Sequence, residues 1–285
     1  MQIRTTEEIL KDVSKGNKEA DIKVISLGVG VQSTAVYLMS SMEYKMPRAD
    51  VAIFSDPGAE GESTYKLLEW LKKWQKENNG IPIVVTNEKN LYKDIIEQEG
   101  TDKKISSMPL FSDMGGMVMR QCTQTYKIHP VIKATREILG IQPRKRMKPT
   151  EMWLGISTDE IQRVKKSGLY NIEYFYPLIY NNMSRLDCIN FFKKNNFPIP
   201  DKSGCVFCPF TNNKSWIKMK KNKPKDFQVA INADNALRNI GKKIKNCSHI
   251  KYYIHPSLKP LEDIEFEDNQ MGMFDEFDCE GHCGL

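Results

Sequence analysis

No long apolar run occurs anywhere in this chain of 285 residues. A helix that spans a bilayer needs about 20 consecutive apolar residues, and no stretch approaches that length. The N-terminus, Met-Gln-Ile-Arg-Thr-Thr-Glu-Glu, also lacks the anatomy of a signal peptide. These absences predict a cytoplasmic protein that does not enter a membrane. In that compartment its seven cysteines are more often thiols or metal ligands than disulfides.

Positive charge is missing from the last part of the chain. Residues 261–285 hold nine acidic residues and no lysine or arginine, whereas residues 1–260 hold 42 basic and 27 acidic residues, a balance of +15. This asymmetry indicates a body that can meet a polyanion, followed by an acidic tail. A lysine-rich surface that is only solvated would have the same composition, so the charge alone leaves both interpretations open.

Internal repeats and low-complexity tracts are also absent, and apolar strands alternate with helices instead. Val24 and Ile25 and residues 50–55, 82–86 and 152–156 have the composition of buried strands. One helix is expected over 32–42, a second begins at about residue 63, and a third ends at about residue 139. A fourth follows Ser184, whose spacing to Asp187 fits a capping box. This alternation predicts an α/β fold, in which right-handed crossovers build a parallel sheet flanked by helices.

A glycine turn joins the first strand to the first helix. Gly28 and Gly30 lack the Cβ atoms that would keep backbone N–H groups away from a ligand. The free N–H groups and the dipole of a helix start attract phosphate, and the hydroxyls of Ser33 and Thr34 add donors. A plain strand-to-helix turn has the same signature. The nucleotide interpretation is favoured because Asp56 also follows a strand, and ligands bind beyond the carboxyl ends of parallel strands.

Two cysteines three positions apart, Cys205 and Cys208, form the most specific local pattern after that turn. One turn of chain brings both sulfurs to the same side, where they can chelate a metal or a cluster. An iron–sulfur cluster, a zinc site and a redox dithiol are all compatible with this spacing. Further ligands are available from Cys122, or from Cys279 and Cys283 near the end of the chain.

A lysine-rich segment is a candidate surface for nucleic acid. Residues 214–225 carry six lysines, with Trp216 and Phe227 interleaved. Lysines contact backbone phosphate without reading sequence, which predicts binding that weakens with salt. A solvated basic helix would have the same pattern.

Taken in order, these motifs resemble the adenine nucleotide alpha-hydrolase superfamily, and within it the phosphoadenosine phosphosulfate (PAPS) reductase-like branch of PP-loop proteins. The resemblance runs from about residue 24 to residue 210. The glycine turn lies where the family has a Ser-Gly-Gly-x-Asp-Ser loop, and Asp56-Pro-Gly58 with the following Glu-Ser-Thr resembles its Asp-Thr-Gly…Glu-Thr segment. The later elements follow in the family's order: Cys122, Lys127 and Pro130; Gly155, Glu160 and Arg163; Tyr176-Pro-Leu-Ile; and Cys205-x-x-Cys208.

The resemblance implies a Rossmann-like PP-loop ATP pyrophosphatase domain over residues 1–210 and a basic helical extension with an acidic, cysteine-containing tail over 211–285. ATP, Mg²⁺ and a [4Fe–4S] cluster are the implied cofactors, with zinc as the alternative metal. The nucleotide would be bound by Ser26, Gly28, Gly30, Gln32, Ser33, Thr34, Gly155 and Glu160. The implied catalytic residues are Asp56, which would hold Mg²⁺, Lys127 and Arg163, which would neutralise charge, and Cys283. The implied metal ligands are Cys122, Cys205, Cys208 and Cys279.

Several positions depart from the family pattern. Gly28 and Gln32 replace the Ser and Asp of the loop, one cysteine, Cys122, stands where reductases have a pair, and Ser157 replaces the Arg of the third motif. These changes argue against a sulfate-assimilation reductase. They favour ATP-dependent sulfur transfer, in which ATP is cleaved between its α and β phosphates, an acceptor is adenylated and sulfur is inserted.

The expected partners are a nucleic acid acceptor (tRNA or DNA), a sulfur donor such as a cysteine desulfurase, and a second copy of the chain in a homodimer. Two other functions stay open. One is a reductase of an adenylyl-sulfate compound, and the other is a metal-stapled, non-catalytic nucleic-acid-binding subunit whose nucleotide pocket has degenerated.

Overall fold

A five-stranded parallel sheet lies at the centre of the larger lobe. The computed structural model describes residues 19–98, 108–238 and 250–267. The strands β1 (Ile22–Ser26), β2 (Val51–Ser55), β3 (Ile83–Thr86), β5 (Thr150–Trp153) and β6 (Ile172–Phe175) are arranged in the order β3-β2-β1-β5-β6. Every neighbouring pair is parallel, with Val24 of β1 opposite both Val51 and Met152. The predicted parallel α/β sheet is therefore confirmed.

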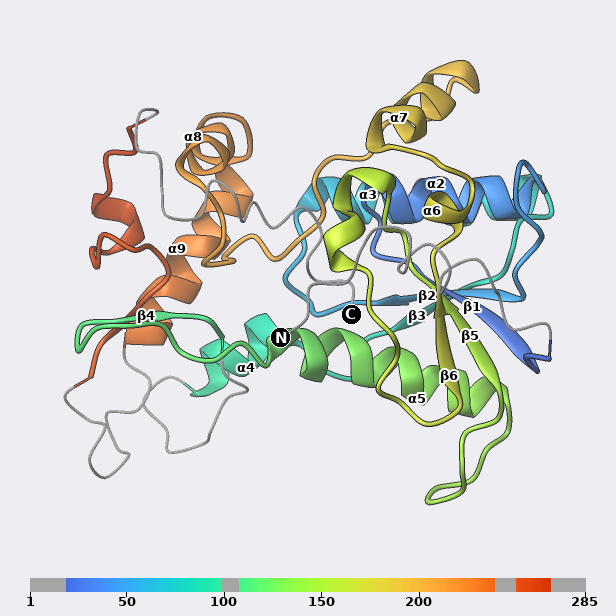
Figure 1. Ribbon diagram of the computed structural model, residues 1–285. Helices are drawn as coiled ribbons and strands as arrows, with labels where there is room; N and C mark the ends of the chain where they lie inside the picture. The colour runs from blue at the N-terminus through green and yellow to red at the C-terminus, as the bar shows by residue number, and fades with distance from the viewer. Residues whose placement is uncertain (1–18, 99–107, 239–249, 268–285) are drawn as a thin grey trace.

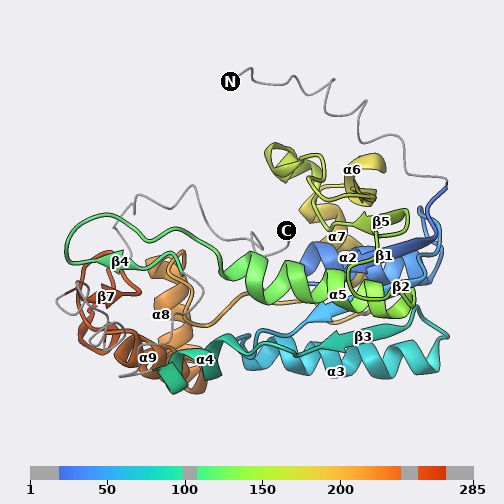
Figure 2. The ribbon, with the colours of Figure 1, turned by 90° about the horizontal axis from the view of Figure 1, so that it is seen from below.

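Helices cover both faces of this sheet (Figures 1 and 2). On one face lie α2 (Val31–Ser41), α3 (Glu62–Glu77), α6 (Pro177–Tyr180) and α7 (Arg185–Lys194), and on the other lies α5 (His129–Ile138), which continues the π-helical turn η1 (Gln124–Ile128). Successive strand residues point to opposite faces. Ile25 and Trp153 accordingly pack in the cluster under α2, whereas Val24 and Met152 pack in the cluster under α5.

Local sequence signals set the helix starts as expected. Ser184 caps α7 through its Oγ, which accepts the N–H of Asp187, and the Asp187 carboxylate accepts the N–H of Ser184 in return. The first helix begins at Val31, one residue before the expected position. Strand β6 and the 3-10 segment η2 (Thr158–Arg163) were not anticipated, because both are short and lie between loop residues.

A smaller lobe packs around a separate apolar cluster (Figure 1). It contains α4 (Leu91–Gln98), α8 (Asn213–Asn222), α9 (Pro224–Arg238), the antiparallel pair β4 (Phe111–Ser112) and β7 (Tyr252–Tyr253), and η3 (Leu261–Asp263). The cluster draws on residues between 59 and 126 as well as on residues 206–266. A division of the chain at residue 210 stays a prediction. No helix in the described ranges has the length and apolarity needed to cross a bilayer.

The aromatics of the lysine-rich segment belong to this second core. Trp216 is fully buried and Phe227 nearly so. Trp216 stacks on Phe266 with ring centroids 6.1 Å apart, and Phe227 meets both rings edge-on. The prediction that these two rings are interleaved with lysines on a binding surface is therefore wrong: Trp216 lies on the inward-packed side of the amphipathic α8, and Phe227 is a buried residue of α9.

Candidate functional site

A cavity opens beyond the carboxyl end of β1, where the strand order reverses. Strands β2 and β3 lie on one side of β1 and strands β5 and β6 on the other, so the loops after β1 and β5 diverge there. Ligands of open α/β sheets bind at such positions. The cavity has an empty volume of about 770 Å³, open mouth included. It brings together eight of the residues expected from the sequence: Ser26, Gly28, Gly30, Gln32, Ser33, Lys127, Gly155 and Arg163.

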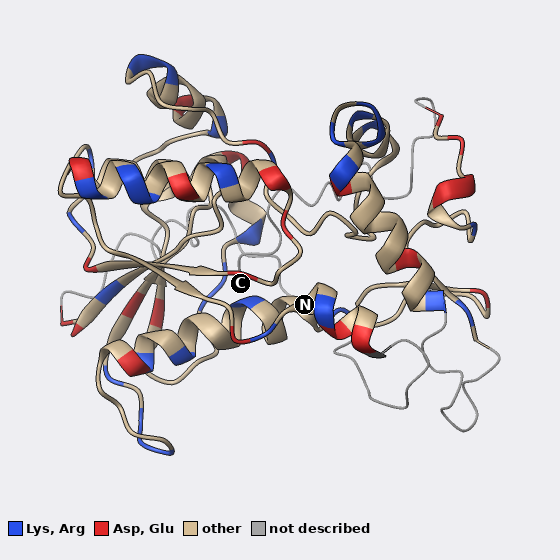
Figure 3. Ribbon diagram, turned by 180° about the vertical axis from the view of Figure 1, so that it is seen from behind, with Lys and Arg blue, Asp and Glu red and all other residues tan. Residues whose placement is uncertain are grey.

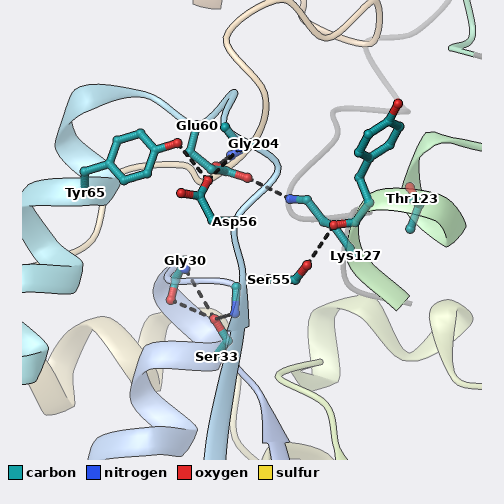
Figure 4. Close-up of polar contacts among 12 residues, drawn as sticks. Gly30, Ser33, Ser55, Asp56, Glu60, Tyr65, Thr123, Lys127 and Gly204 are labelled. Atoms are coloured by element: carbon teal, nitrogen blue, oxygen red, sulfur yellow. Dashed lines mark hydrogen bonds and ion pairs between the residues drawn. The ribbon is translucent and has the colours of Figure 1, made fainter. Parts of the chain in front are cut away.

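The glycine turn closes on itself through the hydroxyl of Ser33 (Figure 4). Its Oγ accepts the N–H groups of Gly28 at 3.2 Å and of Gly30 at 3.3 Å. The N–H groups that we expected to be free for a phosphate therefore have a partner already. The residue between them, Val29, has φ of +58°, which is a strained value for a β-branched residue. The turn thus holds two N–H groups converging on one oxygen, which is the geometry that a phosphate oxygen would meet.

The start of α2 faces the cavity without a side-chain cap. Gly30 occupies the N-cap position and has no side chain to cap the helix, and its own N–H is accepted by the Ser33 Oγ. Gln32 and Ser33 of the first turn both line the cavity. Thr34 does not: it is fully buried in the protein, and its Oγ1 has no hydrogen-bond partner in the described structure. Its expected part in binding the nucleotide stays a prediction that this geometry does not favour.

Gly155 allows the end of β5 to pass directly against the start of α2. A Cβ atom built on Gly155 would lie 2.5 Å from the backbone N of Ser33 and 2.6 Å from its Cα. These are backbone atoms that cannot rotate away, so no larger residue fits without moving one of the two elements. The glycine therefore determines the width of the cavity between its two walls.

Gln32 is part of a buried charge network behind the cavity. Its amide Nε2 donates to Glu160 Oε2 and its Oε1 accepts from Arg185 Nη1, both at 3.3 Å. Arg163 Nη1 lies 2.6 Å from Glu160 Oε1, and both side chains are largely buried. A carboxylate at position 32 would face that of Glu160, and like charges this close repel. The neutral amide of Gln32 therefore matches the local electrostatics, and Glu160 holds Arg163 at the cavity rather than lining it.

Glu60 joins three segments of the site, and sequence reasoning missed it. Its Oε1 lies 2.7 Å from Lys127 Nζ, and its Oε2 accepts the N–H of Gly204 at 2.7 Å (Figure 4). The Glu60 side chain has no exposed surface, and that of Lys127 is 16% exposed. Lys127 also lines the cavity, so this ion pair differs from the exposed pairs of the protein surface. The only sequence signal for Glu60 was an acid two residues after a Pro-Gly turn.

Asp56 lies at the end of β2 but outside the lining of the cavity. Its Oδ1 accepts the N–H of Gly58 at 2.7 Å and the hydroxyl of Tyr65 at 2.8 Å. Burial, reinforced by the Asp56 carboxylate, raises the pKa of Tyr65, so this phenol stays a hydrogen-bond donor. Ser55, the preceding residue, lines the cavity and donates to the carbonyl of Tyr126 at 2.7 Å. The role of Asp56 in binding Mg²⁺ stays a prediction.

Cys205 and Cys208 lie beside the cavity at the end of β1, in a turn closed by the Cys208 N–H and the Cys205 carbonyl at 3.1 Å. Both line a second cavity with an empty volume of about 1000 Å³, open mouth included. Ser203 lines both cavities, so it forms part of the wall between them. Its Oγ would lie 2.9 Å from a Cβ on Gly30, so the two segments are in close contact.

The other cysteines divide into three groups. Cys122 is half-buried and packs, like Cys205, against the core of the smaller lobe. Cys188 is fully buried, and burial raises the pKa of its thiol to about 12, so it is a core residue. Cys247, Cys279 and Cys283 lie outside the described residues.

The cysteine sulfurs are suitable ligands for a metal, but the described structure does not bring enough of them together to complete a site. Cys122, Cys205 and Cys208 are cysteines that form no disulfide, and two of them share one turn. Within the described residues, however, no group of three Cys, His, Asp or Glu side chains is close enough to hold a metal ion. A complete site would therefore need the Cys122 segment to move closer or a ligand from the tail.

Comparisons with known proteins identify no family. No protein-family model and no curated protein matches the chain. Among solved structures it is similar to the U34-tRNA thiolase NcsA from Methanococcus maripaludis with its [4Fe–4S] cluster. The match covers 91% of this chain and 90% of that chain, with 15% sequence identity and a TM-score of 0.37. At that identity and TM-score, the likeness does not establish what this chain binds or which reaction it performs.

Proposed function

We propose that the chain is an ATP-dependent sulfur-transfer enzyme that adenylates an acceptor before sulfur is inserted. The observation that carries the proposal is the cavity at the end of β1, because it combines a strained glycine turn, a helix start whose N-cap residue has no side chain, and two largely buried cations. These are the elements that bind and neutralise a polyphosphate.

Ser33 is the residue that we propose to exchange partners when ATP binds. Its Oγ holds the N–H groups of Gly28 and Gly30 in the ligand-free turn. A phosphate oxygen would take over these two donors, and the Ser33 hydroxyl would turn to donate to another phosphate oxygen. The turn would need no rearrangement, since both N–H groups already converge.

Lys127 and Arg163 would place positive charge beside the phosphates. Each is held by a buried carboxylate, Glu60 and Glu160 respectively, so their ammonium and guanidinium groups are oriented before the ligand arrives. Asp56 would bind Mg²⁺, which would neutralise the leaving pyrophosphate. An acceptor oxygen would attack the α-phosphorus, pyrophosphate would leave, and a sulfur nucleophile would then displace AMP from the acceptor.

The cysteines would deliver the sulfur from the second cavity. Cys205 and Cys208 would be held next to the nucleotide by Ser203 and by the bond from Gly204 to Glu60. With Cys122 as a third ligand they would hold a [4Fe–4S] cluster, or alternatively zinc. A bound cluster with one open iron would supply a site for sulfide, whereas zinc would make the site structural.

The nucleotide site is tested by a pair of serine variants. Ser33→Ala and Ser184→Ala each remove a hydroxyl that accepts a backbone N–H at a helix start, but only Ser33 lines the cavity. We expect Ser33→Ala to weaken ATP binding about tenfold, equivalent to about 1.4 kcal/mol, and Ser184→Ala to leave it unchanged. Equal ATP affinity in the two variants would refute this site.

The reaction is tested by its products. Pyrophosphate and AMP, formed only with an acceptor present, would support the proposal. Release of ADP would contradict cleavage between the α and β phosphates. Thioredoxin-dependent release of sulfite from an adenylyl sulfate would instead establish a reductase, and failure to bind ATP would favour a non-catalytic subunit.

The metal is tested by anaerobic purification followed by iron, sulfide and zinc analysis. We expect about four irons and four sulfides per chain, lost in both Cys122→Ala and Cys205→Ala. Cys188→Ala is the matched control, because this thiol is buried in the other core and should leave the metal content unchanged. Zinc that is retained in Cys122→Ala would separate Cys122 from the metal site.

A further inference from the structure

A third cavity, which we call the α5 groove, lies beside η1, the segment that leads into α5. It is lined by Arg120, Gln124 and Ile128 on one side and by Lys165, Lys166 and Tyr174 on the other, together with Thr123, Gly168 and Leu169. Its empty volume is about 1020 Å³, open mouth included, and no acidic residue is among those that line it. Three cations with no lining carboxylate make this groove a site for an anion larger than a single phosphate.

The groove is built rather than formed by chance surface lysines. The buried hydroxyl of Tyr176 accepts the N–H of Lys165 at 3.1 Å and donates to its carbonyl at 2.8 Å. This double contact fixes the backbone from which Lys165 and Lys166 project. On the opposite wall, the guanidinium of Arg120 packs over the ring of Phe210 at 5.7 Å.

An exposed aromatic ring and a basic turn extend the groove along the protein. Tyr170 follows Leu169, a residue of the groove wall, and is 62% exposed. The guanidinium of Arg146 lies over its ring, 5.5 Å from the centroid. Arg146 belongs to the turn after α5 that carries Arg144, Lys145 and Lys148, and this projecting turn is largely blue in Figure 3. Cations therefore continue from Arg120 to the far end of α5, with one aromatic face among them.

The α5 groove also adjoins the proposed reaction site. Ile128 lines both the groove and the nucleotide cavity, and Lys127 precedes it in the chain. Cys122 lies in the sequence between Arg120 and Thr123, which both line the groove. A chain lying in the groove would therefore pass close to the nucleotide phosphates and to one of the thiols.

We propose that the α5 groove binds a single-stranded segment of nucleic acid, with backbone phosphates on Arg120, Lys165 and Lys166 and a base stacked on Tyr170. Lysine and arginine contact phosphates, and an exposed aromatic ring is a platform for an unpaired base, whose faces a duplex conceals. The proposal rests on the proposed function, since it supplies the acceptor. It moves the nucleic-acid surface from residues 214–225, where Trp216 is buried, to the α5 groove.

The test measures binding of a labelled 12-nucleotide single strand to the full-length chain over a range of salt concentrations. Lys165→Gln/Lys166→Gln removes two groove cations, and Lys214→Gln/Lys221→Gln removes two exposed lysines of α8 as the matched control. Each lost phosphate contact should reduce the slope of log K against log salt by about 0.7. We expect a reduction of about 1.4 in the groove variant and none in the control.

A stacking variant separates the base from the backbone. Tyr170→Ala should weaken binding of the single strand about tenfold at fixed salt while the salt slope stays the same. A duplex of the same sequence should bind more weakly than the single strand and should be insensitive to Tyr170→Ala. A loss of affinity confined to Lys214→Gln/Lys221→Gln, or equal binding of duplex and single strand, would overturn the proposal.

Two further measurements keep the outcomes distinct. ATP affinity should be unchanged in all three variants, because none of the substituted residues lines the nucleotide cavity. If ATP does not bind at all, the proposed function fails, while the salt slopes still decide the groove. If poly-glutamate competes with the single strand at equal charge concentration, the groove is a general polyanion site and the proposal of nucleic acid is refuted.

Discussion

Removing the carboxylate of Glu60 should destabilise the protein more than any surface change. Glu60→Ala leaves the Lys127 ammonium, 16% exposed, without the carboxylate that lies 2.7 Å away, and leaves the N–H of Gly204 without its acceptor. Breaking a buried ion pair by removing one partner costs about 3–5 kcal/mol, to which an unpaired buried N–H adds about 1 kcal/mol. We therefore expect the free energy of unfolding to fall by about 4–6 kcal/mol, a large part of the stability of a typical domain.

Urea unfolding followed by tryptophan fluorescence measures this loss. Glu88→Ala is the matched control, because Glu88 also pairs with a lysine, Lys133, but both side chains are exposed. That pair should contribute less than about 1 kcal/mol. Glu60→Ala/Lys127→Met should recover part of the loss, because no buried charge is then left unpaired. If Glu60→Ala costs no more than Glu88→Ala, the reasoning from burial is refuted.

Two further predictions concern packing and pH. Gly155→Ala should destabilise the fold by about 1–3 kcal/mol and weaken ATP binding, because its Cβ would overlap backbone atoms. Gly168→Ala is the control and should be neutral, because no atom lies within 4 Å of the new Cβ. Unfolding curves of the two variants measure the difference, and equal curves would contradict the prediction. Burial lowers the pKa of His255 to about 4 from 6.5, and its Nδ1 accepts the N–H of Ser257, which protonation would prevent. The unfolded chain therefore binds a proton below pH 6.5 that the folded chain refuses until about pH 4, and stability should fall by about 2 kcal/mol across that window. His255→Gln should lose this dependence, and a wild-type stability that is flat between these pH values would contradict the prediction.

Much of the larger lobe followed from local sequence. The strand before the glycine turn, the helix after it and the capping box at Ser184 are set by patterns that span only a few residues. Buried strands of a parallel sheet appear as short apolar runs because both faces are covered. Because crossovers between parallel strands are right-handed, only a few strand orders are then possible.

The contacts that define the site could not be predicted in this way. Lys127 lies 67 positions and Gly204 lies 144 positions from Glu60 in the sequence, and no local pattern links the three residues. The sequence shows that Gln32 departs from the loop pattern that it resembles, which has Asp at this place. The reason for the amide is the position of Glu160, 128 residues away. In the same way, the sequence shows how many lysines residues 214–225 carry, but it does not show that the side chain of Trp216 packs into the core.

The sequence by itself determined which chemistry-bearing residues the chain has and which strands end at them, because hydrophobic periodicity and turn residues act over short distances. Only the tertiary structure decided which of them meet. It placed Ser33 against the N–H groups of its own turn, hid Thr34 in the core, and separated Asp56 from the cavity. The physical reason is that a buried polar group must find a partner wherever the packed elements present one, and that choice depends on the whole fold.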